Sequence, residues 1–433
     1  MRAKVFLLIV VTCIALAVGQ SVGAETAADS ERIAMSESGA KVWGDSAAEI
    51  TKAVATRSGK TELSKLAASM KPGTWAELKT DMPERLWRAP KPSKGLHIGT
   101  WSDDGHWDSR TGQFLFFGVR QTRKLVAYSE ETNAWRVISF HDKANAPKLK
   151  QQYGHEYAIN GLDPVRSHLY RAGSQYDIIE NTWAKFPKAD FRSMVFEYFT
   201  AMDALVSLER ARGVLWYCRN GDRQWTRIGK IAVHGYHSLA RDNPFRQEVL
   251  FAGGNDSQRV VVITKDGKPK RMKDFPIHGG FTIRTGILTV DPQSGRYLFK
   301  IGTKFVEFDS MTNEYRLIAD FTKTQWPFSK YEAPLVAFIP EYGVTMWADR
   351  KVMLYKHKVC TGEPLPDAPP DIDTKKESPP QPRATDAPSR GIRFRISRSR
   401  PFGPPGEHEN TRTYSFSSHI WPCYFRSSKE YGP

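Results

Sequence analysis

The chain has 433 residues, a formal net charge of +16 and 12% aromatic residues, including 12 Trp. This length allows one large or two ordinary domains, and the aromatic content supports a sizeable core, which excludes a wholly disordered chain. The excess of basic residues suits acidic glycans, anionic envelope surfaces or nucleic acid as partners. No sequence signature of a nucleic-acid-binding module is present, so we do not expect nucleic acid to be the partner.

Residues 1–24 have the features of a secretory signal peptide. Arg2 and Lys4 precede an apolar run at 5–18, and small residues at 22–24 form a cleavage site. The run is shorter than the ~20 apolar residues that a membrane-spanning helix needs, so we expect cleavage and no transmembrane span. The mature protein is therefore predicted to be secreted, periplasmic or extracellular. Residues 25–72, rich in Ala, Ser, Lys and Glu, are predicted to be a weakly helical or partly disordered leader.

From residue 73 to 358, short apolar segments alternate with Gly, Asp, Asn and Pro, which is typical of short strands and tight turns. A unit of about 45 residues recurs six times, with an apolar strand, an acidic turn and a second apolar strand. In most units a polar turn and an aromatic residue follow a third strand, as in YSEETNAW at 128–135. Each unit is predicted to be a four-stranded blade that buries its faces only against its neighbours. The six acidic turn residues are Asp108, Asp163, Glu209, Asp242, Asp291 and Glu341.

The two ends of this region complement each other. The sixth unit has three strands, which end at 352–358, and no fourth strand with an aromatic residue follows them. The segment 73–80 has the character of that missing strand, with Trp75 as its aromatic residue. We therefore predict an all-β, six-bladed propeller in which this N-terminal strand completes the last blade and leaves no open sheet edge.

The acidic turns, the Tyr- and Phe-rich strands and the Thr-Asn-x-Trp/Tyr turns resemble those of kelch-type propellers, including galactose-oxidase-like proteins of the bacterial secreted type. The resemblance covers about 73–358. The chain differs from the kelch pattern in its irregular blade lengths and in lacking the Gly-Gly doublet, except at Gly253-Gly254. The resemblance implies that ligands meet the loops at the mouth of the central channel, where each inner strand begins.

Titratable residues gather a few positions before the acidic turns. Three His beside carboxylates could bind a metal, and His or Tyr beside Arg could abstract a proton from an acidic sugar. Polar residues where strands begin most commonly hydrogen-bond the blade turns or line a wet channel. Of the two functional interpretations, a binding rim is favoured over catalysis, and no metal or cofactor is expected. The predicted ligand-binding residues are Asp104, His106, His155, Glu156, Asp203, Tyr236, His237 and Arg284.

The sequence therefore favours a secreted, monomeric propeller scaffold that binds a protein or an acidic glycan at one face of the ring. The alternative is an enzyme that acts on acidic polysaccharide at the central channel, either a lyase or a glycoside hydrolase. Residues 359–433 are Pro-rich and then Arg/Ser-rich, which predicts a disordered basic tail. Signal cleavage leaves Cys218, Cys360 and Cys423, and both a Cys360–Cys423 pair and unpaired thiols remain open.

Overall fold

The computed structural model divides the chain into two compact units, 1–372 and 373–433, and all of the described residues lie in the first. The predicted signal peptide and residues 369–433 of the predicted tail lie outside the described residues. None of the helices in the described part is both long and apolar enough to cross a bilayer. The described residues are 46–83, 86, 104–118, 124–139, 159–171, 173–191, 193–209, 212–233, 237–254, 257–277, 286–328 and 334–368.

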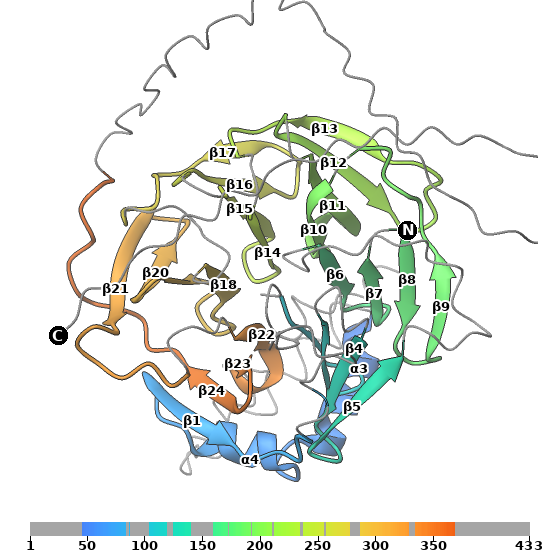
Figure 1. Cartoon of the computed structure of the whole chain (residues 1–433), viewed down its shortest axis with the longest axis vertical. Helices are drawn as coiled ribbons and strands as arrows, with labels where there is room; N and C mark the ends of the chain where they lie inside the picture. The colour runs from blue at the N-terminus through green and yellow to red at the C-terminus, as the bar shows by residue number, and fades with distance from the viewer. Residues whose placement is uncertain are drawn as a thin grey trace, which may run out of the picture. The chain divides into compact units, whose positions relative to one another are not determined.

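The first unit contains six antiparallel sheets of four strands each, which are the blades of a propeller (Figure 1). In chain order, blades one to three are β2 (His106–Asp108), β3 (Gln113–Phe117), β4 (Lys124–Ser129) and β5 (Ala134–Ser139); β6 (Asn160–Asp163), β7 (His168–Arg171), β8 (Ser174–Asp177) and β9 (Thr182–Lys185); β10 (Ser193–Phe199), β11 (Ala204–Glu209), β12 (Val214–Arg219) and β13 (Thr226–Lys230). Blades four to six are β14 (Leu239–Asn243), β15 (Glu248–Ala252), β16 (Val260–Thr264) and β17 (Pro269–Arg271); β18 (Ile287–Val290), β19 (Tyr297–Ile301), β20 (Lys304–Asp309) and β21 (Glu314–Asp320); β22 (Leu335–Ile339), β23 (Val344–Ala348), β24 (Val352–Lys356) and β1 (Thr74–Leu78).

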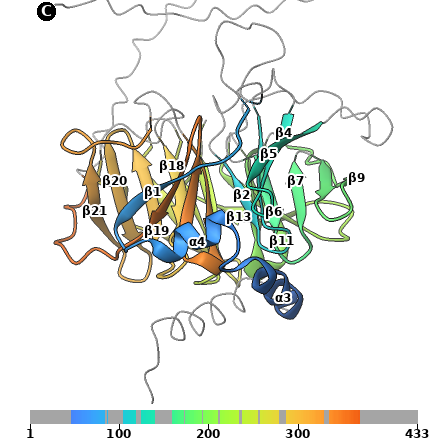
Figure 2. The same cartoon turned by 90° about the horizontal axis from the view of Figure 1, so that it is seen from below.

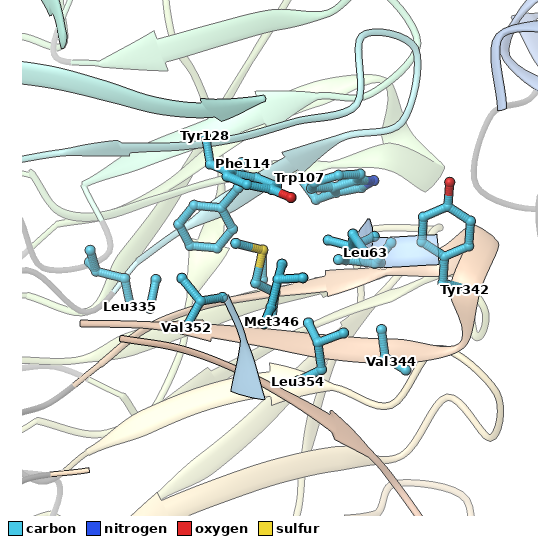
Figure 3. Packing of buried hydrophobic residues seen from close by; sticks show 14 of the residues in the cluster. Leu63, Trp107, Phe114, Tyr128, Leu335, Tyr342, Val344, Met346, Val352 and Leu354 are labelled. Carbon is cyan, nitrogen blue, oxygen red and sulfur yellow. The ribbon is translucent and has the colours of Figure 1, made fainter. Parts of the chain in front are cut away.

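The inner strand of each blade contacts the inner strands of both neighbours, so β2, β6, β10, β14, β18 and β22 form a closed ring. Apolar side chains fill the space between neighbouring blades. Figure 3 shows this packing between blades six and one, where Trp107, Phe114 and Tyr128 meet Met346 and Leu354. Because the blades pack face to face in this way, most second strands read as nearly continuous apolar segments, whereas outermost strands such as β13 and β17 are polar and largely exposed.

Acidic side chains hold the turns that follow several inner strands. Asp291 Oδ2 accepts hydrogen bonds from Ser294 N at 2.9 Å and Ser294 Oγ at 2.6 Å. Asp163 Oδ1 accepts one from Val165 N at 2.9 Å. An Asp in this position satisfies backbone donors that a tight turn would otherwise leave unpaired. The acidic residues therefore mark these turns in the sequence because they hydrogen-bond the backbone a few residues later.

The predicted closure of the ring is confirmed. Strand β1 pairs antiparallel with β24, with Trp75 opposite Tyr355, and so supplies the fourth strand of blade six (Figure 1). The Trp75 ring lies 4.6 Å from that of Tyr355 and 5.6 Å from that of Trp326, measured between centroids. The N-terminal strand therefore completes both a sheet and an aromatic cluster between blades five and six.

The predicted position of Glu209 in the third blade is wrong. Glu209 is the last residue of the second strand, β11, and the segment 206–218 is the hairpin between β11 and β12. The turn after the inner strand is instead the short helix η2 (Thr200–Met202) followed by Asp203, whose φ of 50° is left-handed. Here the acidic residue ends the turn instead of starting it. Matching the units by their acidic residues therefore assigned the turn of this blade to Glu209, one strand too far along the chain.

In the described part of the chain, two helices precede the ring, within the segment predicted as a leader. Helices α3 (Ala47–Arg57) and α4 (Glu62–Ser69) lie on the side where the inner strands end (Figure 2). Arg57 Nε donates a hydrogen bond to Glu130 Oε2 at 2.8 Å, and Arg57 Nη2 donates to the Ser109 carbonyl at 2.5 Å. Both contacts are to turns of blade one, so this segment packs on the propeller.

The described residues after blade six also contact the ring. Leu365 N donates a hydrogen bond to the Tyr315 carbonyl at 2.7 Å, and Cys360 N donates to Glu307 Oε2 at 3.0 Å. Residues 359–368, which the sequence assigned to the tail, therefore run along blade five.

Candidate functional site

Buried polar side chains occupy similar positions in five of the six inner strands, where a propeller has its central channel. The sixth strand has Ala337 there. His106 Nε2 lies 2.6 Å from Asn160 Oδ1, which joins blades one and two through an Nε2–H donor. The five polar residues are His106, Asn160, Glu197, Arg241 and Thr289.

Arg241 links blades across the channel. Its Nη2 donates to Asp104 Oδ1 of blade one, which lies opposite blade four in the ring. Its Nε donates to the Leu288 carbonyl of blade five at 3.3 Å, and its Nη1 is 3.9 Å from Glu197 Oε2 of blade three. Arg241 and Asp104 are 4% and 1% exposed. This buried ion pair therefore closes the channel at the level of the inner strands.

A cavity of about 40 Å³ adjoins this ion pair. A space of this size holds roughly three water molecules and no sugar ring. Three buried polar atoms here, Asn160 Nδ2, Glu197 Oε2 and Asp242 Oδ1, have no hydrogen-bond partner among the described residues. Such atoms are normally satisfied by ordered water. The residues that line the cavity are Gly105, His106, Trp107, Ser109, Leu162, Pro164, Glu197, Tyr198, Thr200, Arg241, Asp242, Pro244, Ala337, Phe338 and Pro340.

Burial changes the protonation of the groups around the cavity. Desolvation raises the pKa of Glu197 well above its usual value, and it raises the pKa of Asp242 to about 7. Desolvation also lowers the pKa of His106. These shifts favour the neutral forms of Glu197, Asp242 and His106.

The raised pKa of Asp242 predicts a pH-dependent stability. Between pH 4 and 7 the folded protein keeps a proton on Asp242 that the unfolded chain releases, so the free energy of unfolding falls as the pH rises. Asp242→Asn removes this contribution, and we expect its stability relative to wild type to rise by up to about 4 kcal/mol across that window. Denaturant titrations at pH 4, 5.5 and 7 measure the difference. The exposed control Asp190→Asn should keep the wild-type slope; equal slopes for Asp242→Asn and wild type would contradict the prediction.

The structure brings together two of the predicted site residues and separates a third from them. Asp104 and His106 lie in the channel, with 3.6 Å between Asp104 Oδ2 and His106 Nε2. Asp203 lies at the opposite end of an inner strand, where its Oδ1 accepts from Arg166 Nη1 at 2.6 Å and from the Tyr198 hydroxyl at 2.5 Å. Its prediction as a channel-mouth residue was wrong, because it followed from the misplaced turn of blade three.

Of the five remaining predicted site residues, His237 lies within the described part of the chain and the other four do not. His237 is buried just before β14 and has a φ of 73°. His155, Glu156, Tyr236 and Arg284 lie outside the described residues. The sequence analysis missed Asn160, Glu197 and Arg241. A usable signal was present for Glu197, which is a charged residue inside an otherwise mostly apolar inner strand, whereas Arg241 lies in a strand whose next two residues, Asp242 and Asn243, are also polar.

The described residues contain no group of three or more His, Cys, Asp or Glu that could hold a metal ion. Cys218 and Cys360 are free thiols, and Cys423 lies outside the described part of the chain.

Fold and channel together define a six-bladed β-propeller whose centre is closed by a buried charge network.

No protein-family model matches the sequence, and neither does any of the curated proteins compared with it. Among solved structures, the chain is similar to an auxiliary nutrient binding protein from Bacteroides ovatus, with 8% identity, a TM-score of 0.46 and coverage of 65% of this chain and 75% of that one. It is also similar to a protein of unknown function from Bacteroides thetaiotaomicron, with 10% identity, a TM-score of 0.45 and coverage of 67% and 73%. A streptogramin B lyase structure has 12% identity, a TM-score of 0.40 and coverage of 57% and 76%. Likeness at this level carries no information about ligand or activity.

Proposed function

We propose that the protein is an exported, kelch-like propeller that binds an acidic carbohydrate at one face of the ring and does not act on it chemically. The observation that carries this proposal is the closed channel. The charged groups there contact one another around a cavity of about 40 Å³. A lyase or hydrolase in the channel would need room for a sugar ring beside its acid and base.

The two faces of the ring differ in what covers them. Helices α3 and α4 pack where the inner strands end. At the opposite face the first and third strands of each blade begin, and the second and fourth strands end. We name this side the loop face, and it is the side to which we assign the ligand, since loops on a rigid scaffold commonly carry binding residues.

Charge favours an acidic ligand over a neutral one. Exposed cations at the outer edge of blades three and four form no ion pair with a described residue. Those in the turns between third and fourth strands lie at the face opposite the loop face, so they contribute to the long-range field of the chain, which carries +16, and not to the loop face itself. Unpaired cations attract polyanions at long range and suit carboxylated or sulfated polymers. These cations are Arg219, Arg223, Arg227, Lys230, Lys265 and Lys270.

The proposal is tested with the chain from residue 25 onward and two forms of one polymer, polygalacturonate and its carboxyl-reduced counterpart. We expect binding of the acidic form that weakens as salt is added, and at least tenfold weaker binding of the reduced form. Ultraviolet absorbance of the same mixtures reports unsaturated uronate ends. No binding of either form would overturn the proposal, and a steady rise in absorbance would establish the lyase alternative in its place.

A further inference from the structure

A lysine without an acidic partner lies between blades five and six, near the loop face. Lys300 is near the end of β19, and its side chain is 4% exposed. It forms no ion pair or hydrogen bond with a described residue. Other cations of blade five are paired: Lys304 with Asp320 and Arg296 with Glu307. Lys300 is therefore an exception within its own blade.

One aromatic ring lies against this ammonium, and a second cation lies against the neighbouring ring. Lys300 Nζ lies 4.9 Å from the centroid of the Trp326 ring, and Lys351 Nζ lies 6.0 Å from that of Phe328. The two rings are 5.4 Å apart. Trp326 is half-buried, and its buried Nε1 has no hydrogen-bond partner among the described residues. The Lys300 ammonium and the Trp326 indole N–H, both strong hydrogen-bond donors, therefore lie close together without an acceptor among the described residues.

The contributing segments all belong to the loop face. Lys300 stands just before the turn between β19 and β20. Trp326 and Phe328 lie in the connection from β21 to β22, and Lys351 lies in the turn between β23 and β24. These three connections come from two adjacent blades, so a ligand on the loop face would meet all of them.

The energetics favour an anion here. A buried ion is costly unless it is paired, and a cation–π contact offsets only part of that cost. Burial accordingly lowers the pKa of Lys300 to about 8. An anion that accepts hydrogen bonds from Lys300 and Trp326 would remove most of this cost, because charge-assisted hydrogen bonds are the stronger kind.

We propose that Lys300, Trp326 and Lys351 form a subsite for the carboxylate of a uronic acid residue, with the Trp326 ring as its apolar contact. This inference rests on the proposed function and assigns the binding of its ligand to a specific place on the ring. A sugar fits better than an acidic peptide because the subsite combines a cation with an aromatic surface on which the C–H face of a sugar ring can pack.

The test uses the chain from residue 25 onward and a hexamer of galacturonate at pH 7. We expect Lys300→Met to weaken binding at least tenfold and, at the same time, to raise the melting temperature, because it removes an unpaired buried charge. Trp326→Phe keeps an aromatic ring but removes the N–H donor, and we expect a loss of about threefold to tenfold. Lys60→Met, an exposed lysine beside the helices on the other face, should change affinity less than twofold.

The outcomes separate this subsite from the proposed function. If wild type binds no galacturonate, the proposed function itself fails. If wild type binds and Lys300→Met binds equally well, the subsite is wrong and the function stands. A Lys300→Met variant that melts lower than wild type shows a structural role and also overturns the subsite. Equal, Lys300-dependent binding of a poly-glutamate peptide would overturn the assignment to a sugar.

Discussion

Arg241→Met is expected to lower the free energy of unfolding by about 3–5 kcal/mol, because it breaks a buried ion pair. The substitution leaves the Asp104 carboxyl 1% exposed, without the guanidinium with which it forms an ion pair. It also removes the hydrogen bond to the Leu288 carbonyl and hence the link between blades one, four and five. Equilibrium unfolding in urea, followed by Trp fluorescence, measures the loss.

Two controls distinguish an uncompensated charge from a general loss of packing. The double variant Asp104→Asn/Arg241→Met removes both charges, and it should recover much of the stability that Arg241→Met loses. Arg271→Met breaks an ion pair with Asp274 whose side chains are 41% and 30% exposed, so its cost should stay below about 1 kcal/mol. An Arg241→Met variant within 1 kcal/mol of wild type would show that the ion pair does not hold the ring together.

The blade architecture was predictable because its signals are local. An acidic side chain that accepts from the backbone two or three residues later fixes a turn within a few positions, as Asp163 and Asp291 do. The terminal closure was predictable for a different reason. The last unit lacked one strand and the N-terminal segment supplied one of the right character, so the repeat count alone paired Trp75 with blade six.

Blade three marks the limit of that reasoning. Its inner strand ends in a short helix, and the acid that closes this turn, Asp203, comes after the helix in a left-handed conformation. Matching the units by their acidic residues therefore assigns the turn to Glu209, which lies at the end of the next strand. A search for the third- and fourth-strand hairpin, which does match in this blade, would have placed the strands correctly.

The channel network was only half predictable from sequence. Asp104 and His106 stood out because they lie close to the turn of blade one. Their partner Arg241 is 137 residues away from Asp104, and only the closure of six blades brings the two together. Local patterns indicate which residues begin a strand, but they carry no information about which side chains meet across the ring.

Trp75→Ala is expected to cost about 3 kcal/mol, because it empties the cluster that joins the closing strand to blades five and six. The Trp75 ring contacts five aromatic rings with centroids 4.6–6.5 Å away. Those rings belong to Phe305, Trp326, Phe328, Trp347 and Tyr355. The matched control is Trp183→Ala, a half-buried aromatic residue on β9, the fourth strand of blade two, which an ordinary hairpin already holds in place. We expect the control to cost clearly less, as measured by urea unfolding.

Two truncations then separate the closing strand from the helices that precede it. A chain that starts at residue 73 loses α3 and α4 but keeps β1, whereas a chain that starts at residue 81 loses β1 as well. Without β1 the backbone groups of β24 form an open sheet edge beside exposed aromatic rings, which favours association between chains. We therefore expect the shorter chain to aggregate on size-exclusion chromatography and the longer one to elute as a monomer. A monomeric, cooperatively unfolding chain from residue 81 would show that the ring does not depend on its N-terminal strand.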